Sequence, residues 1–225
     1  MAKVRLDTLL AQRGLFDSRA RAAASVMAGE VRLGGRGGER AAKPGQLVAD
    51  DVEVAVDERP RFVSRGGVKL ANALDATGID PAGRRCLDVG ASTGGFTDCL
   101  LQRGAEHVVA LDVAYGELHW SLRTDERVTV IERSNARSLA CADLPYAPDL
   151  VVADVSFISL TKVLPAVAAA AAPSFDLLAM IKPQFEVGRE RIGKGGVVRS
   201  ADDRRAALVS VGEFARSELG LEVLG

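Results

Sequence analysis

Cysteine and histidine are scarce in this chain of 225 residues. The three cysteines, Cys86, Cys99 and Cys141, are odd in number and lie in apolar surroundings. We interpret them as buried thiols of a protein in a reducing compartment, not as a disulfide framework. The two histidines share no ligand spacing with a pair of cysteines. We therefore expect no zinc site, and no other metal site, in this protein.

A long apolar run is missing as well. The longest one, residues 163–172, is interrupted by Pro165 and closed by Pro173, so it is too short and too broken to span a bilayer. The N-terminus has no apolar segment behind its charges, so we expect no signal peptide. With 48% hydrophobic and 26% charged residues, the composition is typical of a folded protein. We expect a cytoplasmic protein that makes no contact with a membrane.

Two common phosphate-binding motifs are also absent, although the chain has a glycine-rich turn within residues 85–98. It contains no Gly-x-Gly-x-x-Gly and no Gly-Lys-Ser/Thr. The turn reads Asp88-Val-Gly-Ala-Ser-Thr-Gly-Gly-Phe-Thr-Asp98 and joins a short apolar run to an apolar-periodic segment. Glycines permit positive φ angles and close backbone approach, and the start of a helix offers unpaired N–H groups. The pattern predicts a strand, a ligand-binding turn and a helix.

Acidic residues close two of the predicted strands. Asp88 lies at the end of the strand before the turn, where it would repel a pyrophosphate but could accept a hydrogen bond from an ammonium group. Asp112 ends a second apolar strand and is placed to bind ribose hydroxyls, as acids do in nucleotide-binding α/β sheets. We infer a ligand that carries a positive amino-acid head and a ribose.

Strands and helices alternate after residue 64. Apolar runs predict strands at 86–89, 108–112, 128–131, 149–154 and 176–181, then a helix at 202–219 and a further strand at 221–224. This alternation predicts an α/β fold with a doubly wound, mostly parallel sheet, in a domain that covers residues 64–225.

A separate small α+β domain is predicted at residues 1–56. Apolar spacing and capping residues predict helices at 5–13 and 19–28, and alternating faces predict strands at 31–33 and 52–56. Residues 57–63 are charged, contain proline and lack periodicity, so we place a linker there.

The N-terminal end is basic, although the whole chain has a net charge of −1. Residues 1–43 contain nine Lys and Arg against four acids, a surplus that suits an anionic polymer. The predicted RNA contacts are Lys3, Arg5, Arg13, Arg19, Arg21 and Arg32, with Arg65, Arg189 and Lys194 further along the chain. The alternative is that these residues form only a solvated face, and in either case we expect Arg13, Arg19 and Arg21 to face solvent.

Three polar residues gather where the predicted strands end. Asp154 ends one strand, Lys182 ends the next, and Lys69 comes from the helix before the first strand. Ligands of open α/β sheets bind beyond the carboxyl ends of the strands. Partial desolvation and the like charge of Lys69 should lower the pKa of Lys182, and Asp154 can pair with either ammonium. The alternative for Lys182 is a strand-end lysine that reaches solvent.

These motifs resemble those of the FtsJ-like ribose 2′-O-methyltransferases. Together with Asp154-Val-Ser-Phe-Ile-Ser-Leu160, Ile181-Lys-Pro-Gln-Phe-Glu186 and Gly193-Lys-Gly-Gly-Val-Val198, the turn resembles more narrowly the TlyA family of rRNA methyltransferases. The resemblance implies S-adenosylmethionine as cofactor, bound by Asp88, Gly90, Ser92, Thr93, Gly94, Gly95, Phe96, Asp112 and Asn135. The N-terminal helices, strand and turn resemble the RNA-binding module of ribosomal protein S-four.

The resemblance also implies a reaction. It is the transfer of a methyl group to the ribose 2′-hydroxyl of a cytidine in 16S or 23S rRNA, or in both, with ribosomal subunits as partners and without a metal. The family uses a Lys-Asp-Lys-Glu tetrad, which Lys69, Asp154 and Lys182 match, with Lys182 as general base. The glutamate, which the family carries on a strand after the long helix, has no counterpart, so we expect a domain truncated at its C-terminus.

Two other functions are weighed against this one. The first is an RNA-binding relative that keeps the cofactor fold without activity, which the missing glutamate would favour. The second is a hemolysin, a label that relatives of this family have carried. The sequence opposes this label because it shows neither a secretion signal nor a spanning segment. The target nucleotide and the oligomeric state do not follow from the sequence.

Overall fold

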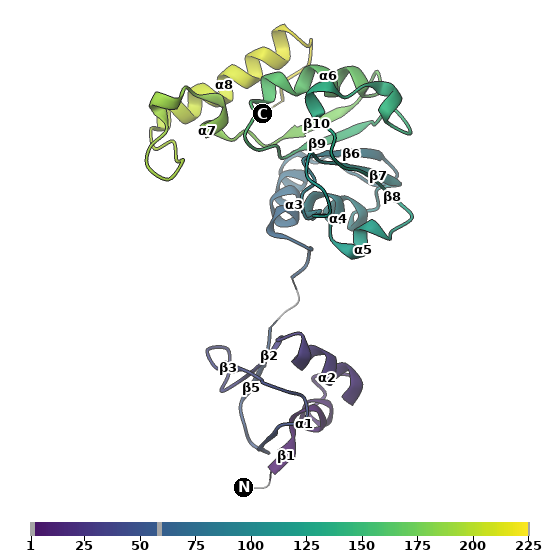
Figure 1. The fold of residues 1–225 in the computed structure, drawn as a ribbon, viewed down its shortest axis with the longest axis vertical. Coiled ribbons are helices and arrows are strands. Elements are labelled where there is room, and N and C mark those ends of the chain that lie inside the picture. Colours follow the sequence, from purple (N-terminus) through teal and green to yellow (C-terminus); the bar gives the residue numbers. More distant parts are fainter. Residues whose placement is uncertain (1–2, 58–59, 225) are drawn as a thin grey trace. The chain divides into compact units, whose positions relative to one another are not determined.

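The computed structural model describes residues 3–57 and 60–224, and the chain divides into two compact units, Met1–Pro60 and Arg61–Gly225 (Figure 1). The division falls within residues 57–63, which the sequence marks as a linker. Each unit has a hydrophobic core of its own, as a separate domain requires.

The first unit contains two short helices and two small antiparallel sheets. Its helices are α1 (Leu6–Gln12) and α2 (Arg19–Met27), and its strands are β1 (Lys3–Arg5), β2 (Val31–Leu33), β3 (Glu39–Arg40), β4 (Leu47–Ala49) and β5 (Val54–Val56). β1 pairs with β4, and β2 lies between β3 and β5. α2 begins after Ser18, whose hydroxyl accepts a hydrogen bond from the backbone N–H of Arg21. Leu6 and Leu10 of α1 pack against Val26 of α2 in the core.

The second unit is built on a five-stranded sheet in which every neighbouring pair of strands is parallel. The strands are β6 (Arg85–Val89), β7 (His107–Leu111), β8 (Val128–Ile131), β9 (Leu150–Ala153) and β10 (Asp176–Ala179), in the order β10-β9-β6-β7-β8. The predicted doubly wound, mostly parallel sheet is therefore confirmed. Because the strand order reverses between β6 and β9, the turn after β6 opens at the point where such sheets bind ligands.

Helices cover both faces of this sheet (Figure 1). α3 (Arg65–Thr77) and α4 (Gly95–Gln102) pack on one face, and α6 (Leu164–Ala170) and α8 (Ala201–Ser217) pack on the other. Side chains of a strand alternate between its faces. Cys86 therefore packs in the core with α3 and α4, whereas Leu87 packs with α6 and α8. The remaining elements are α5 (Trp120–Arg123), α7 (Pro183–Glu186), η1 (Ala136–Ser138), η2 (Cys141–Asp143), η3 (Leu160–Lys162) and η4 (Arg189–Arg191).

Two expectations from the sequence are wrong. Residues 221–224 form no strand, and the N–H of Leu221 instead donates to the carbonyl of Ala215 at 3.0 Å, at the end of α8. Cys141 is exposed, whereas Cys86 and Cys99 are buried as expected. None of the helices in the described part of the chain is both long enough and apolar enough to cross a membrane.

Candidate functional site

A cleft of about 680 Å³ lies at the carboxyl ends of the central strands. Its walls come from α3, from the turn after β6, and from the segments that follow β9 and β10. Of the residues predicted to act in the site, the cleft brings together Arg65, Lys69, Gly90, Ser92, Thr93, Gly95, Phe96, Asp154 and Lys182. A volume of this size is typical of sites for small molecules and cofactors.

An ion pair between Asp154 and Lys182 lies in this cleft. The Nζ atom of Lys182 is 2.6 Å from Oδ1 of Asp154, and both side chains are about one-fifth exposed, at 20% and 21%. The same Nζ donates to the hydroxyl of Ser156 at 2.7 Å and lies 3.4 Å from the backbone carbonyl of Asp154. Sequence reasoning missed Ser156, although its place two residues after Asp154 in the quoted motif could have identified it. The lysine is thus held by three oxygens from the segment that follows β9.

Lys69 projects from α3 into the same cleft without joining this ion pair. Its Nζ atom lies 3.9 Å from the sulfur of Met180, and it has no other polar partner among the described residues. The amine is exposed and faces the space that Asp154 and Lys182 also line. The cleft therefore holds a second cation whose hydrogen bonds are available to a ligand.

The glycine turn approaches its neighbours too closely for side chains, and at two positions the nearby atoms include backbone. Gly90 has a φ of +86°, and a Cβ atom there would lie 3.0 Å from the carbonyl oxygen of Asp154. A Cβ atom on Gly95 would lie 2.8 Å from the backbone nitrogen of Gly67 and would collide with the hydroxyl of Ser64. The two glycines let the turn lie directly against the segment that follows β9 on one side and against α3 on the other.

Asp88 lies beneath this turn and is completely buried. Its Oδ2 atom accepts hydrogen bonds from the backbone N–H of Thr97 at 2.9 Å and from the Thr97 hydroxyl at 2.7 Å. Its Oδ1 atom has no partner among the described residues. Burial raises the pKa of the Asp88 carboxyl to about 7, against the two hydrogen bonds, which lower it. Asp88 is not a wall of the cleft, so the predicted contact with an ammonium group stays a prediction that Oδ1 alone could fulfil.

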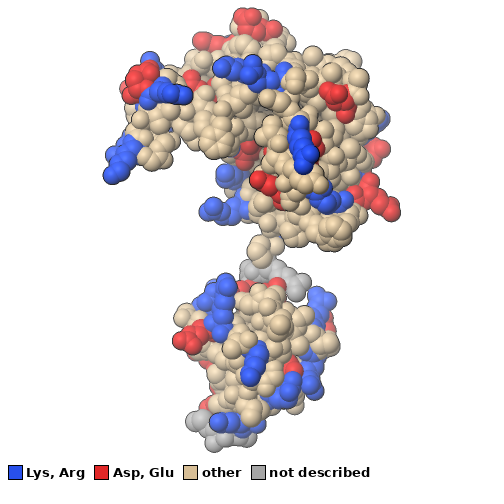
Figure 2. Space-filling model, viewed as in Figure 1, with Lys and Arg blue, Asp and Glu red and all other residues tan. Residues whose placement is uncertain are grey.

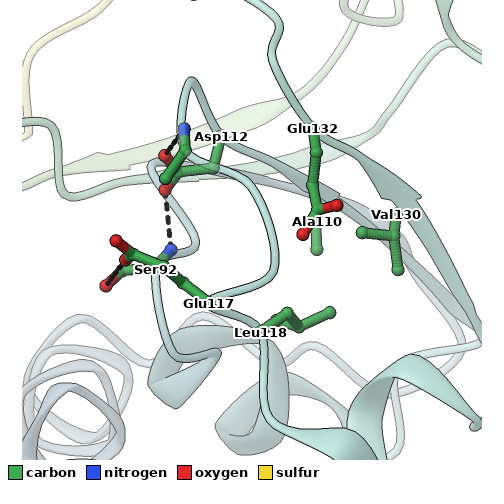
Figure 3. Close-up of a pocket in the computed structure, with 8 residues that line it drawn as sticks. Ser92, Ala110, Asp112, Glu117, Leu118, Val130 and Glu132 are labelled. Carbon is green, nitrogen blue, oxygen red and sulfur yellow. Dashed lines mark hydrogen bonds between the residues drawn. The ribbon is translucent and has the colours of Figure 1, made fainter.

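Asp112 joins two loops at the edge of a second, smaller cavity (Figure 3). Its Oδ2 atom accepts from the backbone N–H of Ser92 at 2.7 Å, and its Oδ1 atom accepts from that of Ala114 at 2.8 Å. Glu117 and Glu132 line the same cavity, and the Glu117 carboxylate lies 3.2 Å from the hydroxyl of Ser92. Sequence reasoning missed both glutamates. Glu132 directly follows β8 as Asp112 follows β7, so its place at a strand end could have identified it, whereas Glu117 lies in a loop that follows no strand. The cavity is thus acidic on several sides, and its floor is apolar.

Asn135 is not brought to either cavity. It is exposed and precedes η1, where its side chain accepts a hydrogen bond from the backbone N–H of Arg137 at 3.1 Å. Its predicted cofactor contact stays a prediction. The segment that carries His119 does contact the glycine turn, because the N–H of His119 donates to the carbonyl of Thr93 at 3.2 Å. The next residue, Trp120, begins α5 and is 73% exposed.

Basic side chains are spread over the surface of the first unit (Figure 2), but several of them have internal partners. Arg13 is exposed as expected, but it also donates to the carbonyls of Asp50 and Val52 at 2.6 and 2.7 Å. Arg32 pairs with Asp57, and Arg5 and Arg19 both pair with Asp7. The hydrogen bond from Arg5 holds the pKa of the Asp7 carboxyl at about 2.

The remaining predicted RNA contacts have exposed basic groups. Lys3 and Arg21 lie in the first unit, and neither side chain forms a hydrogen bond or an ion pair with the rest of the described chain. In the second unit Arg65 lines the cleft, and Arg189 and Lys194 are exposed in the loop after α7. These five positions, unlike Arg13 and Arg32, can contact a phosphate without first giving up an internal bond.

The chain is similar to known methyltransferases and to proteins named hemolysins. Residues 62–218 match the family described as FtsJ-like methyltransferase. The chain is 49% identical to the 16S/23S rRNA (cytidine-2′-O)-methyltransferase TlyA of Mycobacterium tuberculosis, over 99% of this chain and 82% of that protein. It is 39% identical to Hemolysin A of Brachyspira hyodysenteriae, over 87% of this chain and 81% of that protein. A solved structure from Streptococcus thermophilus, also named a hemolysin, is 42% identical and superposes with a TM-score of 0.72, over 100% of this chain and 82% of that one.

Proposed function

Because the chain belongs to the FtsJ-like methyltransferases and, within them, to the TlyA family, we propose that it methylates a ribose 2′-hydroxyl of rRNA. The acceptor in this proposal is a cytidine of 16S or 23S rRNA, as the name of the Mycobacterium tuberculosis relative states for that protein. The observation that carries the proposal is the ion pair of Asp154 and Lys182 at the mouth of a cleft beside the glycine turn.

The residues around the turn fit S-adenosylmethionine. Its ammonium group would be held by Oδ1 of Asp88, a buried acceptor with no partner among the described residues, and its ribose hydroxyls would be held by the carboxylate of Asp112. The absence of side chains at Gly90 and Gly95 leaves backbone atoms next to the ligand space. When bound, S-adenosylmethionine supplies an electrophilic methyl group on a sulfonium.

Lys182 acts as the general base in this proposal. Lys182 first releases a proton to solvent, and the neutral amine then takes the proton of the ribose 2′-hydroxyl. The carboxylate of Asp154, 2.6 Å away, stabilises the ammonium that forms again. Ser156 fixes the direction of the amine by accepting a second hydrogen bond from it. Lys69, on the opposite wall, is placed to hold the RNA near the reacting ribose. Alignment of the nucleophile with the methyl group supplies most of the acceleration.

The first unit docks on rRNA in this proposal, and the protein works in the cytoplasm, where ribosomal subunits are. Lys3 and Arg21 are exposed and offer charges to the phosphate backbone. Contacts of this kind position an RNA without reading its bases, so the choice of nucleotide falls to the cleft.

The test is transfer of a labelled methyl group from S-adenosylmethionine to isolated small and large ribosomal subunits. We expect label at a ribose 2′-oxygen, and a loss of about 100-fold or more in the rate of transfer for Lys182→Ala. Lys162→Ala is the matched control, because Lys162 is an exposed lysine of the same unit that does not line the cleft.

Calorimetry of cofactor binding separates the outcomes. If the unmodified chain binds S-adenosylmethionine but transfers no methyl group, the result would favour the alternative that the chain is an RNA-binding protein without activity. Equal transfer by Lys182→Ala and the unmodified chain would contradict the assigned base. Loss of transfer with unchanged cofactor binding would support it.

A further inference from the structure

Two segments carry the members of the catalytic pair. Residues 154–160 follow β9 and include Asp154 and Ser156, and residues 182–186 follow β10 and begin with Lys182. β9 and β10 are parallel neighbours, with Ala153 paired to Ala179, so both segments leave the sheet at the same edge. The geometry of the pair therefore depends on what holds these two segments together beyond the sheet.

The carboxylate of Glu186 makes a two-point contact between them. Its Oε1 atom accepts the backbone N–H of Leu160 at 2.9 Å, and its Oε2 atom accepts the hydroxyl of Ser159 at 2.6 Å. Glu186 is partly buried and ends α7, whereas Ser159 and Leu160 begin η3. A hydrogen bond to an ionised carboxylate is stronger than one between neutral groups, so both contacts are effective restraints.

The segment between the two anchored points is strained. Phe157 has a φ of +65°, a conformation that bulky side chains rarely adopt and that persists only where the surroundings impose it. Ser156, on one side of it, is held by Lys182, and Ser159, on the other side, is held by Glu186. The ring of Phe157 also packs on that of Phe185, with centroids 5.4 Å apart. The contacts of Ser156, Phe157 and Ser159 with the segment after β10 thus follow one another in the same order along both segments. Together they hold a strained loop that would otherwise relax.

We propose that Glu186 is a positioning residue whose carboxylate holds η3 to α7 and so keeps the amine of Lys182 against Asp154 and Ser156. The proposal rests on the function proposed above and assigns to that site a residue that does not touch the substrate. Loss of the carboxylate frees the strained segment, and the ion pair loses its fixed geometry. A displacement of about 1 Å in a catalytic group can cost about 100-fold in rate.

The test compares Glu186→Ala with Glu186→Gln in methyl transfer to ribosomal subunits. Glu186→Ala should lower kcat by about 10- to 100-fold and leave the KM for S-adenosylmethionine unchanged, because the glycine turn lies on other elements. Glu186→Gln should recover most of kcat, because an amide can still accept from Leu160 and can donate to Ser159. Glu190→Ala is the control, since Glu190 is an exposed carboxylate of the same loop, with a side chain that is 75% exposed. A kcat for Glu186→Ala equal to that of the control overturns the proposal.

A second measurement is independent of turnover. Brief acylation with acetic anhydride, followed by peptide mass spectrometry, compares the reactivity of Lys182 with that of Lys43, an exposed lysine of the first unit. In Glu186→Ala the ratio of Lys182 to Lys43 acylation should rise several-fold, because the amine is no longer held. An unchanged ratio overturns the proposal. If the unmodified chain transfers no methyl group, the proposed function fails while this ratio still decides the role of Glu186.

Discussion

Asp88 lies near the end of β6 and Asp154 directly follows the neighbouring strand β9, yet the two carboxyl groups have different surroundings. Asp154 pairs with the ammonium of Lys182 at 2.6 Å and is a charged wall of the cleft. Asp88 is completely buried, receives hydrogen bonds from Thr97 alone among the described residues, and has a pKa raised to about 7 by its burial. The nearby carboxylates of Asp154 and Asp112 raise the pKa further. A cation bound at the free Oδ1 atom of Asp88 would therefore lower the pKa of this carboxyl and favour its ionised form.

The raised pKa of Asp88 predicts a stability that depends on pH. The folded chain holds this proton more tightly than the unfolded chain, whose aspartates have a pKa of about 4. The free energy of unfolding that the group contributes is fully present below about pH 4 and is lost as the pH rises to about 7. Asp88→Asn should remove this decline. Denaturant titrations at pH 5 and pH 8 without cofactor measure it, and an equal decline in both proteins would contradict the assigned pKa.

At the scale of single residues, the sequence predicts pairs that the sheet brings together but not those that loops bring together. Asp154 and Lys182 meet because parallel strands end at one edge, which a strand pattern alone predicts. Glu186 meets Ser159 and Leu160 only through the course of two irregular loops, which no periodicity encodes. The hydrogen bonds of Arg13 to two carbonyls could not be predicted from the sequence for the same reason, since its position suggests a cation without internal partners.

At the scale of elements, long apolar patterns are predicted well and short ones are not. The strand at 128–131 and the strand at 31–33 have the expected bounds. The other predicted strands differ by one or two residues at their ends, except that at 221–224, which does not form. β1, β3 and β4 are missed because two or three residues carry no measurable periodicity. The short helix α7 is missed because its residues lie beside a glycine-rich and charged loop.

Alanine should have opposite effects on the free energy of unfolding at two helical glycines, because Gly95 lies in the tight contact between α3 and α4 and Gly212 does not. Gly95→Ala places a methyl group against Gly67 and Ser64 and should reduce the free energy of unfolding by about 1–3 kcal/mol. Gly212→Ala in α8 meets only Val223, at 3.8 Å, and should increase it by about 0.5–1 kcal/mol. Denaturant titrations of the two variants make the comparison. A stabilised Gly95→Ala would show that α3 and α4 can separate freely.

At the scale of the whole molecule, two separate cores predict two separable activities. Residues 61–225 contain the sheet, the cleft and the glycine turn, and their core does not draw on the first unit. We expect this fragment to unfold in one cooperative transition and to bind S-adenosylmethionine as the full chain does.

Methyl transfer by residues 61–225 should instead be weak. Without the basic first unit, the KM for ribosomal subunits should rise and its dependence on salt concentration should become shallower, because fewer counterions are released on binding. Kinetics of both proteins across a range of salt concentrations measure this. A fragment that matched the full chain at every salt concentration would contradict the assigned role of the first unit.

The contact of His119 with the glycine turn gives the protein an optical reporter of its own. Trp120 is the sole tryptophan of the sequence, it is 73% exposed, and it directly follows the residue that bonds to Thr93. Leu122, two residues further along α5, lies where a side chain on Gly94 would collide. A ligand that shifts the turn therefore changes the solvent exposure of the Trp120 indole. The fluorescence of this single tryptophan can then report ligand binding without any added label.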